Sequence, residues 1–112
     1  MADDRERRIG KNEALFREVN ERIERVAGSL QLTTERLAIL CECGDDSCTE
    51  RIDVTLADYE RIRRDSELFF VCRGHEQADV EDIIEQTDDY DVVRKKAGPA
   101  AELAHELDPR DN

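Results

Sequence analysis

Apolar residues recur at helical spacing through the first part of the chain, and they predict one long amphipathic helix over residues 3 to 27. The members of this stripe follow one another at intervals of seven, three, four and three residues: Ile9, Phe16, Val19, Ile23 and Val26. Gly28, followed by Ser29, is expected to end the helix. Because the stripe is narrow, the helix could pack against its own domain or pair with the same helix of a second copy.

Two short segments after this helix have the pattern of a β-hairpin. Residues 37 to 42 form an apolar run typical of a buried strand, and residues 50 to 55 alternate so that Ile52 and Val54 share one face. Between them lies Gly44-Asp45-Asp46-Ser47, a cluster of turn-forming residues. We therefore expect the two strands to pair around this turn.

The next part of the chain predicts a short helix and then a buried strand. Thr55 begins the helix with a start like a capping box, in which Asp58 is the third helical residue. The helix is expected to run to about Arg64. Residues 68 to 72 are the most apolar run in the chain and are predicted to form the central strand of the sheet.

The last third of the chain is less clearly patterned. Residues 80 to 86 fit either a turn of helix or a strand, and residues 90 to 94 are predicted to form a strand. Gly98 and Pro99 open a short final helix, since proline suits the first helical position. Residues 108 to 112 are expected to be frayed.

The composition indicates a lean hydrophobic core. Hydrophobic residues make up 38% of the chain and aromatic residues 4%, tryptophan is absent, and 41% of the residues are charged. Folding must offset an ordering cost of about 1–2 kcal/mol per residue, so a small core needs additional stabilisation. A bound metal ion would supply it, because affinity for the folded site becomes folding free energy.

The net charge narrows the classes of partner. With 17 basic and 29 acidic residues the net charge is −12, which repels phosphate backbones and anionic lipid headgroups. We therefore expect no nucleic acid and no membrane partner, but a protein partner or self-association, although a saline environment could select the same acidity. The N-terminus is charged and no apolar stretch has secretory or membrane-spanning length, so a cytoplasmic location is expected.

Candidate metal ligands lie in two segments. Cys41, Cys43 and Cys48 fall within eight residues across the predicted turn, and Cys72 and His75 follow the predicted central strand. In a reducing compartment clustered cysteines are more often metal ligands than disulfides. Thiolates exclude Mg²⁺ and Ca²⁺, and tetrahedral Zn²⁺ takes four cysteine or histidine ligands. The sequence therefore predicts one structural zinc ion held between the two segments.

Five candidate side chains compete for four positions on the metal. Three thiolates and an imidazole leave the site less negative than four thiolates, which is easier in an acidic protein. We therefore favour Cys41, Cys43, Cys48 and His75, with Cys72 as a buried thiol or the alternative ligand. A disulfide between Cys43 and Cys48, and a catalytic thiol with His75 as its base, remain alternative interpretations.

Three segments resemble, in the same order, motifs of a set of small uncharacterised bacterial proteins of similar length: Phe16-Arg-Glu-Val-Asn-Glu-Arg-Ile23, Cys41-Glu-Cys-Gly-Asp-Asp-Ser-Cys-Thr-Glu-Arg51 and Gly74-His-Glu76. The resemblance covers nearly the whole chain. It implies three cysteine ligands and the histidine of the Gly-His-Glu motif, and it leaves Cys72 outside the ligand set. It implies no established function.

These patterns predict an α+β fold with a small antiparallel sheet of about three to four strands, a zinc-stabilised turn, a long N-terminal helix and short helices. We expect a single domain over residues 1–112. Residues 1–30 would form the N-terminal helix, which could dimerise, residues 37–95 the zinc-binding core, and residues 99–107 the short C-terminal helix.

The favoured function is a small acidic zinc-binding domain with a structural metal site that acts through protein–protein interaction. Four protein ligands leave no open position on a metal, and the chain has no Walker A, G-x-G-x-x-G, H-E-x-x-H or G-x-S-x-G motif. An alternative is a small zinc- or cysteine-dependent enzyme in which Glu76 or Glu42 is the general base. A second alternative is a nucleic-acid-binding zinc domain.

Overall fold

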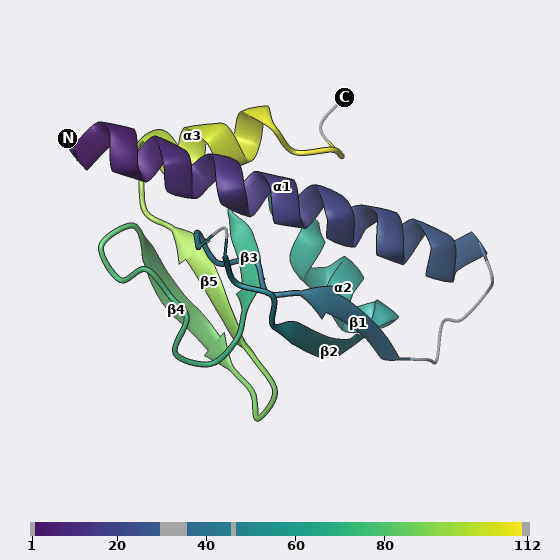
Figure 1. Cartoon of the computed structure of the whole chain (residues 1–112). Coiled ribbons are helices and arrows are strands. Elements are labelled where there is room, and N and C mark those ends of the chain that lie inside the picture. Colours follow the sequence, from purple (N-terminus) through teal and green to yellow (C-terminus); the bar gives the residue numbers. More distant parts are fainter. Residues whose placement is uncertain (1, 30–35, 46, 111–112) are drawn as a thin grey trace.

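Two small antiparallel sheets lie beneath a long N-terminal helix (Figure 1). We describe residues 2–29, 36–45 and 47–110 from a computed structural model. The helices are α1 (Ala2–Ser29), α2 (Leu56–Arg63) and α3 (Pro99–Glu106). One sheet pairs β1 (Arg36–Leu40) with β2 (Arg51–Thr55), and the other has the order β3 (Leu68–Val71), β5 (Asp91–Lys95), β4 (Glu81–Gln86). The fold is α+β with one long and two short helices, which confirms the predicted class.

The predicted hairpin and the helix that follows it form as their patterns indicate. Ile39 lies opposite Ile52 in the antiparallel pair β1–β2, and the side chains of Ile52 and Val54 are both buried. At the start of α2 the hydroxyl of Thr55 accepts a hydrogen bond from the N–H of Asp58 at 3.1 Å, the interaction of an N-cap. Asp46, in the predicted turn, lies outside the described residues.

The predicted central strand is in fact at the side of its sheet. β5 pairs with both β3 and β4, and the ambiguous segment is the strand β4. The four residues of β3 are nevertheless all buried, because the chain after β1 covers its other edge. The N–H of Glu42 donates to the carbonyl of Phe70 at 2.7 Å, and the N–H of Phe70 donates to the Glu42 carboxylate at 2.9 Å. This junction joins the two sheets.

The long helix buries the predicted stripe only in part: Ile9 is buried and Ile23 packs against the core. α1 continues through Gly28 to Ser29, so the glycine does not end it. Two members of the apolar stripe are exposed, Val19 at 36% and Val26 at 60%. The fully or almost fully buried polar side chains of the helix are Glu13, Arg17, Asn20 and Glu21. The physical reason is that other elements present partners for them, so the layer beneath α1 is largely polar.

One group of these partners surrounds Lys95. Its ammonium group has no exposed surface and forms ion pairs with the carboxylates of Glu13 and Glu81. Phe69 lies below this group, with the Arg17 guanidinium and the Lys95 ammonium each 4.8 Å from its ring centre. Burial raises the pKa of Glu13 well above its usual value. The ion pair with Lys95 opposes this effect, because the ammonium group favours the charged form of Glu13.

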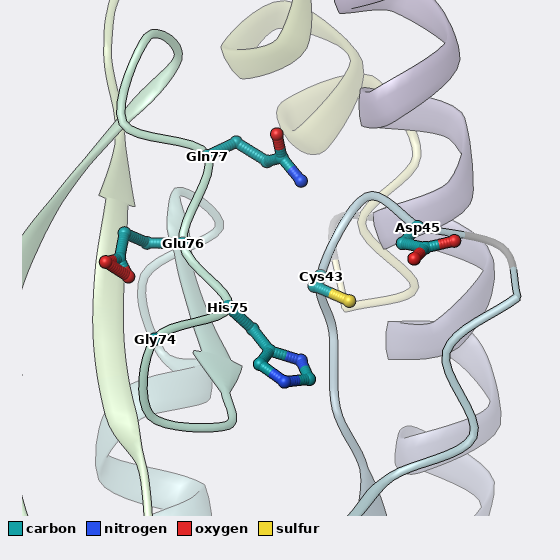
Figure 2. A pocket seen from close by; sticks show the side chains of 6 residues that line it. All are labelled: Cys43, Asp45, Gly74, His75, Glu76 and Gln77. Carbon is teal, nitrogen blue, oxygen red and sulfur yellow. The ribbon is translucent and has the colours of Figure 1, made fainter.

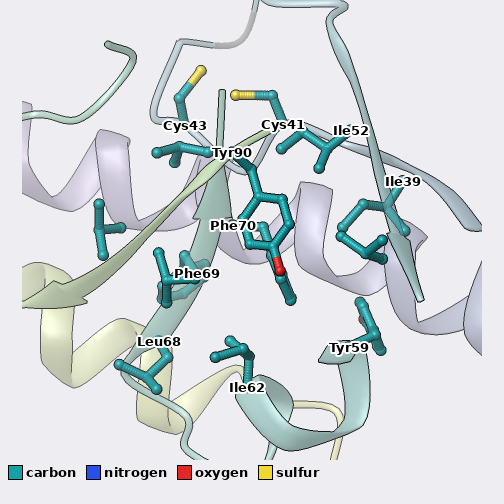
Figure 3. Close-up of a cluster of buried hydrophobic side chains, with 14 of the residues drawn as sticks. Ile39, Cys41, Cys43, Ile52, Tyr59, Ile62, Leu68, Phe69, Phe70 and Tyr90 are labelled. Atoms are coloured by element: carbon teal, nitrogen blue, oxygen red, sulfur yellow. The ribbon is translucent and has the colours of Figure 1, made fainter. Parts of the chain in front are cut away.

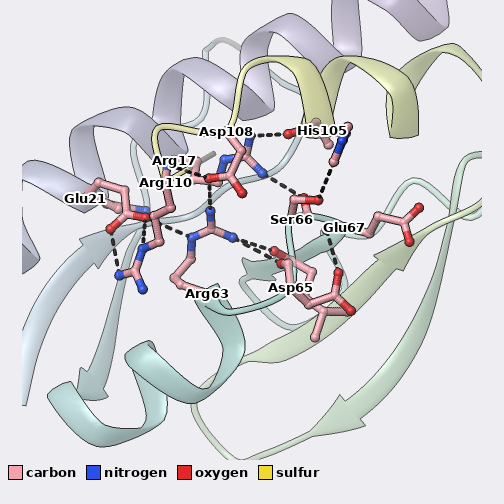
Figure 4. Close-up of polar contacts among 12 residues, drawn as sticks. Arg17, Glu21, Arg63, Asp65, Ser66, Glu67, His105, Asp108 and Arg110 are labelled. Atoms are coloured by element: carbon pink, nitrogen blue, oxygen red, sulfur yellow. Dashed lines mark hydrogen bonds and ion pairs between the residues drawn. The ribbon is translucent and has the colours of Figure 1, made fainter. Parts of the chain in front are cut away.

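A second group holds the C-terminal segment (Figure 4). The buried Arg63 pairs with Asp108 at 3.2 Å, and Arg110 pairs with Glu21 at 2.5 Å and with Glu60 at 3.0 Å. The expectation that the chain is frayed from residue 108 is therefore wrong for residues 108–110, and residues 111–112 lie outside the described range.

The apolar core fills the space between the sheets and α2 (Figure 3). Tyr59 stacks on Phe70 with ring centres 5.6 Å apart, and Tyr90 meets Phe70 edge-on at 5.3 Å. Cys41 and Cys43 are buried at one end of this cluster. Within the described residues, no helix has an apolar stretch of the length that crossing a bilayer requires.

Candidate metal centre

Four of the five predicted ligands come together at the junction between the sheets. Cys41 and Cys43 follow β1, Cys48 precedes β2, and His75 follows β3. The ligand atoms of these four side chains all lie within 4.8 Å of one another. Figure 2 shows the imidazole of His75 reaching from its loop toward the segment that carries Cys43. The group could hold a metal ion.

The distances in the cluster fit a tetrahedral ion. The Nδ1 atom of His75 lies 3.5 Å from the Sγ atom of Cys41 and 3.7 Å from the Sγ atom of Cys48. Metal–ligand bonds of about 2.3 Å to sulfur and 2.0 Å to nitrogen, at tetrahedral angles, separate S and N atoms by about 3.5 Å. These two separations therefore match tetrahedral Zn²⁺, and the remaining pairs of ligand atoms lie within 4.8 Å of one another.

Cys72 lies beside the cluster without belonging to it. Its backbone N–H donates a hydrogen bond to the Sγ atom of Cys41 at 3.2 Å, and its carbonyl accepts one from the N–H of His75 at 2.9 Å. N–H donors of this kind stabilise thiolates in metal sites. Burial raises the pKa of the Cys72 thiol. Cys72 thus contacts the cluster through its backbone N–H, and its thiol also interacts with Cys41.

Without a cation, the environment of the cluster disfavours the thiolate form of its cysteines. Hydrogen bonding with Cys41, together with burial, raises the pKa of Cys43, and burial raises the pKa of Cys48. Three thiolates this close together repel one another unless positive charge lies between them. A bound divalent cation would offset this repulsion by its positive charge. Coordinated thiols are therefore deprotonated. All four cysteines are free thiols in the structure.

Two glycines shape the loops that carry the ligands, for different reasons. A Cβ atom at Gly44 would lie 2.4 Å from the Cγ2 atom of Ile9, so α1 passes too close for any side chain there. Gly74 has open space around it but a φ of 85°, which L-residues rarely adopt. Gly44 was expected to serve a tight turn, and the structure shows instead that it allows close approach of α1.

Neither glutamate proposed as a general base faces the cluster. Glu42 is fully buried between Cys41 and Cys43 but points the other way, accepting hydrogen bonds from the Phe70 N–H at 2.9 Å and the Asn20 amide at 2.8 Å. Burial raises its pKa. The side chain of Glu76 points away from the pocket beside His75 (Figure 2).

That pocket is small and polar. It has a volume of about 230 Å³ and opens next to two of the candidate ligands. Its lining residues come from the two loops: Cys43, Asp45, Gly74, His75, Glu76 and Gln77. Hydrogen bonds from the hydroxyl and N–H of Ser47 lower the pKa of Asp45. The carboxylate of Asp45 therefore lies in the pocket wall and accepts a hydrogen bond from the Ser47 hydroxyl at 2.6 Å.

Sequence reasoning missed the side chain that connects the helix to the site. Asn20 accepts a hydrogen bond from the N–H of Leu40 at 2.7 Å and donates to its carbonyl at 2.9 Å, directly before the first cysteine. Its amide also binds Glu42. The sequence signal that could have indicated Asn20 is the motif over residues 16–23 that resembles other proteins. The buried residues of this motif are polar.

No family model, no curated protein and no solved structure matches this chain. The similarity to small uncharacterised bacterial proteins therefore stays a prediction, and the site has to be interpreted from its own geometry.

Proposed function

We propose that the chain is a small zinc-binding domain in which Cys41, Cys43, Cys48 and His75 bind one structural Zn²⁺. The observation that carries this proposal is the convergence of four soft ligand atoms within 4.8 Å. Zinc suits the set better than Mg²⁺ or Ca²⁺, which prefer oxygen ligands, and tetrahedral Cys₃His is a common structural coordination.

The proposed ion would tie the two sheets together. Three ligands lie in the hairpin of the first sheet and the fourth follows β3 of the second, so the ion would close a loop of about 30 residues. In the described residues, the hydrogen bonds between Glu42 and Phe70 and the bond from the Cys72 N–H to the Sγ atom of Cys41 already link the sheets at this point. Metal affinity would therefore add directly to the stability of the junction.

We further propose that the domain is not catalytic, is cytoplasmic, and acts by binding a protein partner. Four protein ligands leave no open position on the ion, and the two glutamates considered as general bases point away from the cluster. The net charge of −12 disfavours nucleic acid as the partner. The enzyme alternative would need a water molecule in place of one ligand.

The test is the metal content and coordination of the isolated protein. Native mass spectrometry should show one Zn²⁺ per chain. X-ray absorption should show three sulfur atoms at about 2.3 Å and one nitrogen at about 2.0 Å. Four sulfur ligands would assign the fourth position to Cys72, and a ligated water would support the enzyme alternative.

Variants separate the two candidate fourth ligands. Cys43→Ser should abolish stoichiometric zinc binding, whereas Cys72→Ser should retain one ion per chain, since four other ligand atoms already converge within 4.8 Å. If His75→Ala keeps its zinc and the double variant with Cys72→Ser loses it, the thiol replaces the imidazole. Loss of zinc in Cys72→Ser alone would contradict the proposed ligand set.

A further inference from the structure

The helix α1 sorts its charges by face. Six of its seven basic residues are exposed, whereas only two of its six described acidic residues are exposed. The acids turn inward to the polar layer beneath the helix, where Glu13 and Glu21 are buried. The outer face of the helix is therefore basic in a chain whose net charge is −12.

Six of the exposed residues form one continuous line along the helix, which we call the outer stripe. Its members follow at intervals of three and four residues: Arg8, Lys11, Leu15, Glu18, Arg22 and Arg25. Two basic ends thus flank a centre made of one apolar and one acidic residue. At a rise of 1.5 Å per residue, about 16 Å separate Lys11 from Arg22.

Most of these cations have no counterion among the residues that the structure describes. Arg8, Lys11 and Arg25 form no ion pair with any residue in the described ranges, and Arg22 pairs only with the exposed Glu18, at 3.2 Å. An exposed pair of this kind is weak, on the order of 0.5 kcal/mol. The charge of the stripe is therefore available to a partner.

The centre of the stripe offers an apolar anchor point. Leu15 is 57% exposed and Leu107, which follows α3, is 47% exposed. With Ala14, Lys11 and Glu18 they line a depression of about 210 Å³. An exposed apolar depression with polar residues around it is typical of protein interaction sites, whereas phosphate backbones offer it no apolar contact.

We propose that the outer stripe of α1 binds an amphipathic segment of an acidic partner protein. This segment would carry two acidic clusters about 16 Å apart, with an apolar side chain between them that enters the depression at Leu15. The inference rests on the proposed non-catalytic interaction role, and it adds the surface and the chemistry of the partner.

Charge complementarity excludes the same stripe of a second copy as the occupant. In an antiparallel pairing centred between Leu15 and Glu18, Lys11 would face Arg22 and Arg8 would face Arg25, so cations would oppose cations at both ends. A parallel pairing would place each cation against itself. Screening over about 8 Å at physiological salt keeps the acidic remainder of the chain from cancelling the local attraction.

The probe is a synthetic helical peptide with two glutamate pairs eleven residues apart and a central leucine, titrated into the zinc-loaded protein. NMR shift mapping should place it on the outer stripe, with affinity that falls as salt rises. Changing both Lys11→Glu and Arg22→Glu should weaken binding about tenfold or more. Leu15→Ser, or serine at the central position of the peptide, should also weaken it.

Arg64→Glu is the matched control, because it reverses an exposed arginine on another surface and should leave binding unchanged. Shifts mapped to another face, or equal binding by the charge-reversed variant, would overturn the assignment of the surface. Tighter binding of duplex DNA or of phosphatidylserine vesicles would overturn the class of partner. Zinc content and melting temperature, measured on the same samples, report separately on the metal site.

Discussion

Lys95 shows how much of this fold depends on single buried charges. Its ammonium group, with no exposed surface, lies between Glu13 and Glu81. Replacing it by methionine keeps the volume but leaves two carboxylates facing each other without a cation. We expect Lys95→Met to cost about 3–5 kcal/mol of unfolding free energy, measured by urea denaturation.

The neighbouring lysine is the control for this prediction. Lys96 is 44% exposed and lies 3.7 Å from Asp82, so Lys96→Met should change the unfolding free energy by less than about 1 kcal/mol. Similar losses in the two variants would mean that the buried ion pairs do not stabilise the fold.

The raised pKa of Glu24 predicts that the stability of the fold depends on pH. Burial, a hydrogen bond with Glu60 and the charge of Glu60 raise the pKa of Glu24 from 4.5 to about 7. The folded state then keeps a proton that the unfolded state has lost, so stability falls as pH rises from about 4.5 through 7. Glu24→Gln should remove this loss, which denaturant unfolding at pH 5 and pH 8 would detect. Parallel pH profiles for the two proteins would contradict the shift.

At the scale of elements, α1 packs closely against the loop that carries Cys43 because Gly44 has no side chain. A methyl group at Gly44 would meet Ile9 at 2.4 Å, so we expect Gly44→Ala to cost about 1–3 kcal/mol in thermal or urea unfolding. In the background of Ile9→Ala the same change should cost less than about 1 kcal/mol, because the clashing methyl is gone. An undiminished cost would place the cause elsewhere.

The sequence predicted elements well where apolar periodicity decided burial. Ile52 and Val54 alternate and are buried, and Thr55 caps α2, because these are local signals. The buried face of α1 was predicted only in part, since its charged residues find partners such as Lys95 that lie far along the chain and leave no local pattern. β3 has the apolar character of a central strand because the segment after β1 covers its outer edge.

The candidate site was predictable for a similar reason. The three clustered cysteines and a histidine after a strand are visible in the sequence, and the structure brings these four together. The support for the site was not visible, because Asn20 and Glu42 act through contacts between elements.

At the scale of the whole molecule, the candidate metal centre lies at the seam of two sheets that share a lean core. Removing the metal with excess chelator should lower the melting temperature and cost several kcal/mol, with residues 41 to 76 losing structure first. Circular dichroism and metal analysis of the same sample would measure this. An unchanged melting temperature after verified metal loss would contradict a structural role for zinc.

Side chains accept hydrogen bonds from two backbone N–H groups at that seam: Glu42 links the two sheets, and Asn20, from α1, binds the edge of β1. The N–H of Leu40 donates to Asn20, and the N–H of Phe70 donates to Glu42. Strand pairing is ordinarily beyond the reach of point mutation, because every residue other than proline carries the same N–H and C=O groups. Here these two contacts are encoded in residue identity. A single substitution at Asn20 or Glu42 can therefore change how the two sheets are held together, while the backbone hydrogen bonds within each sheet stay intact.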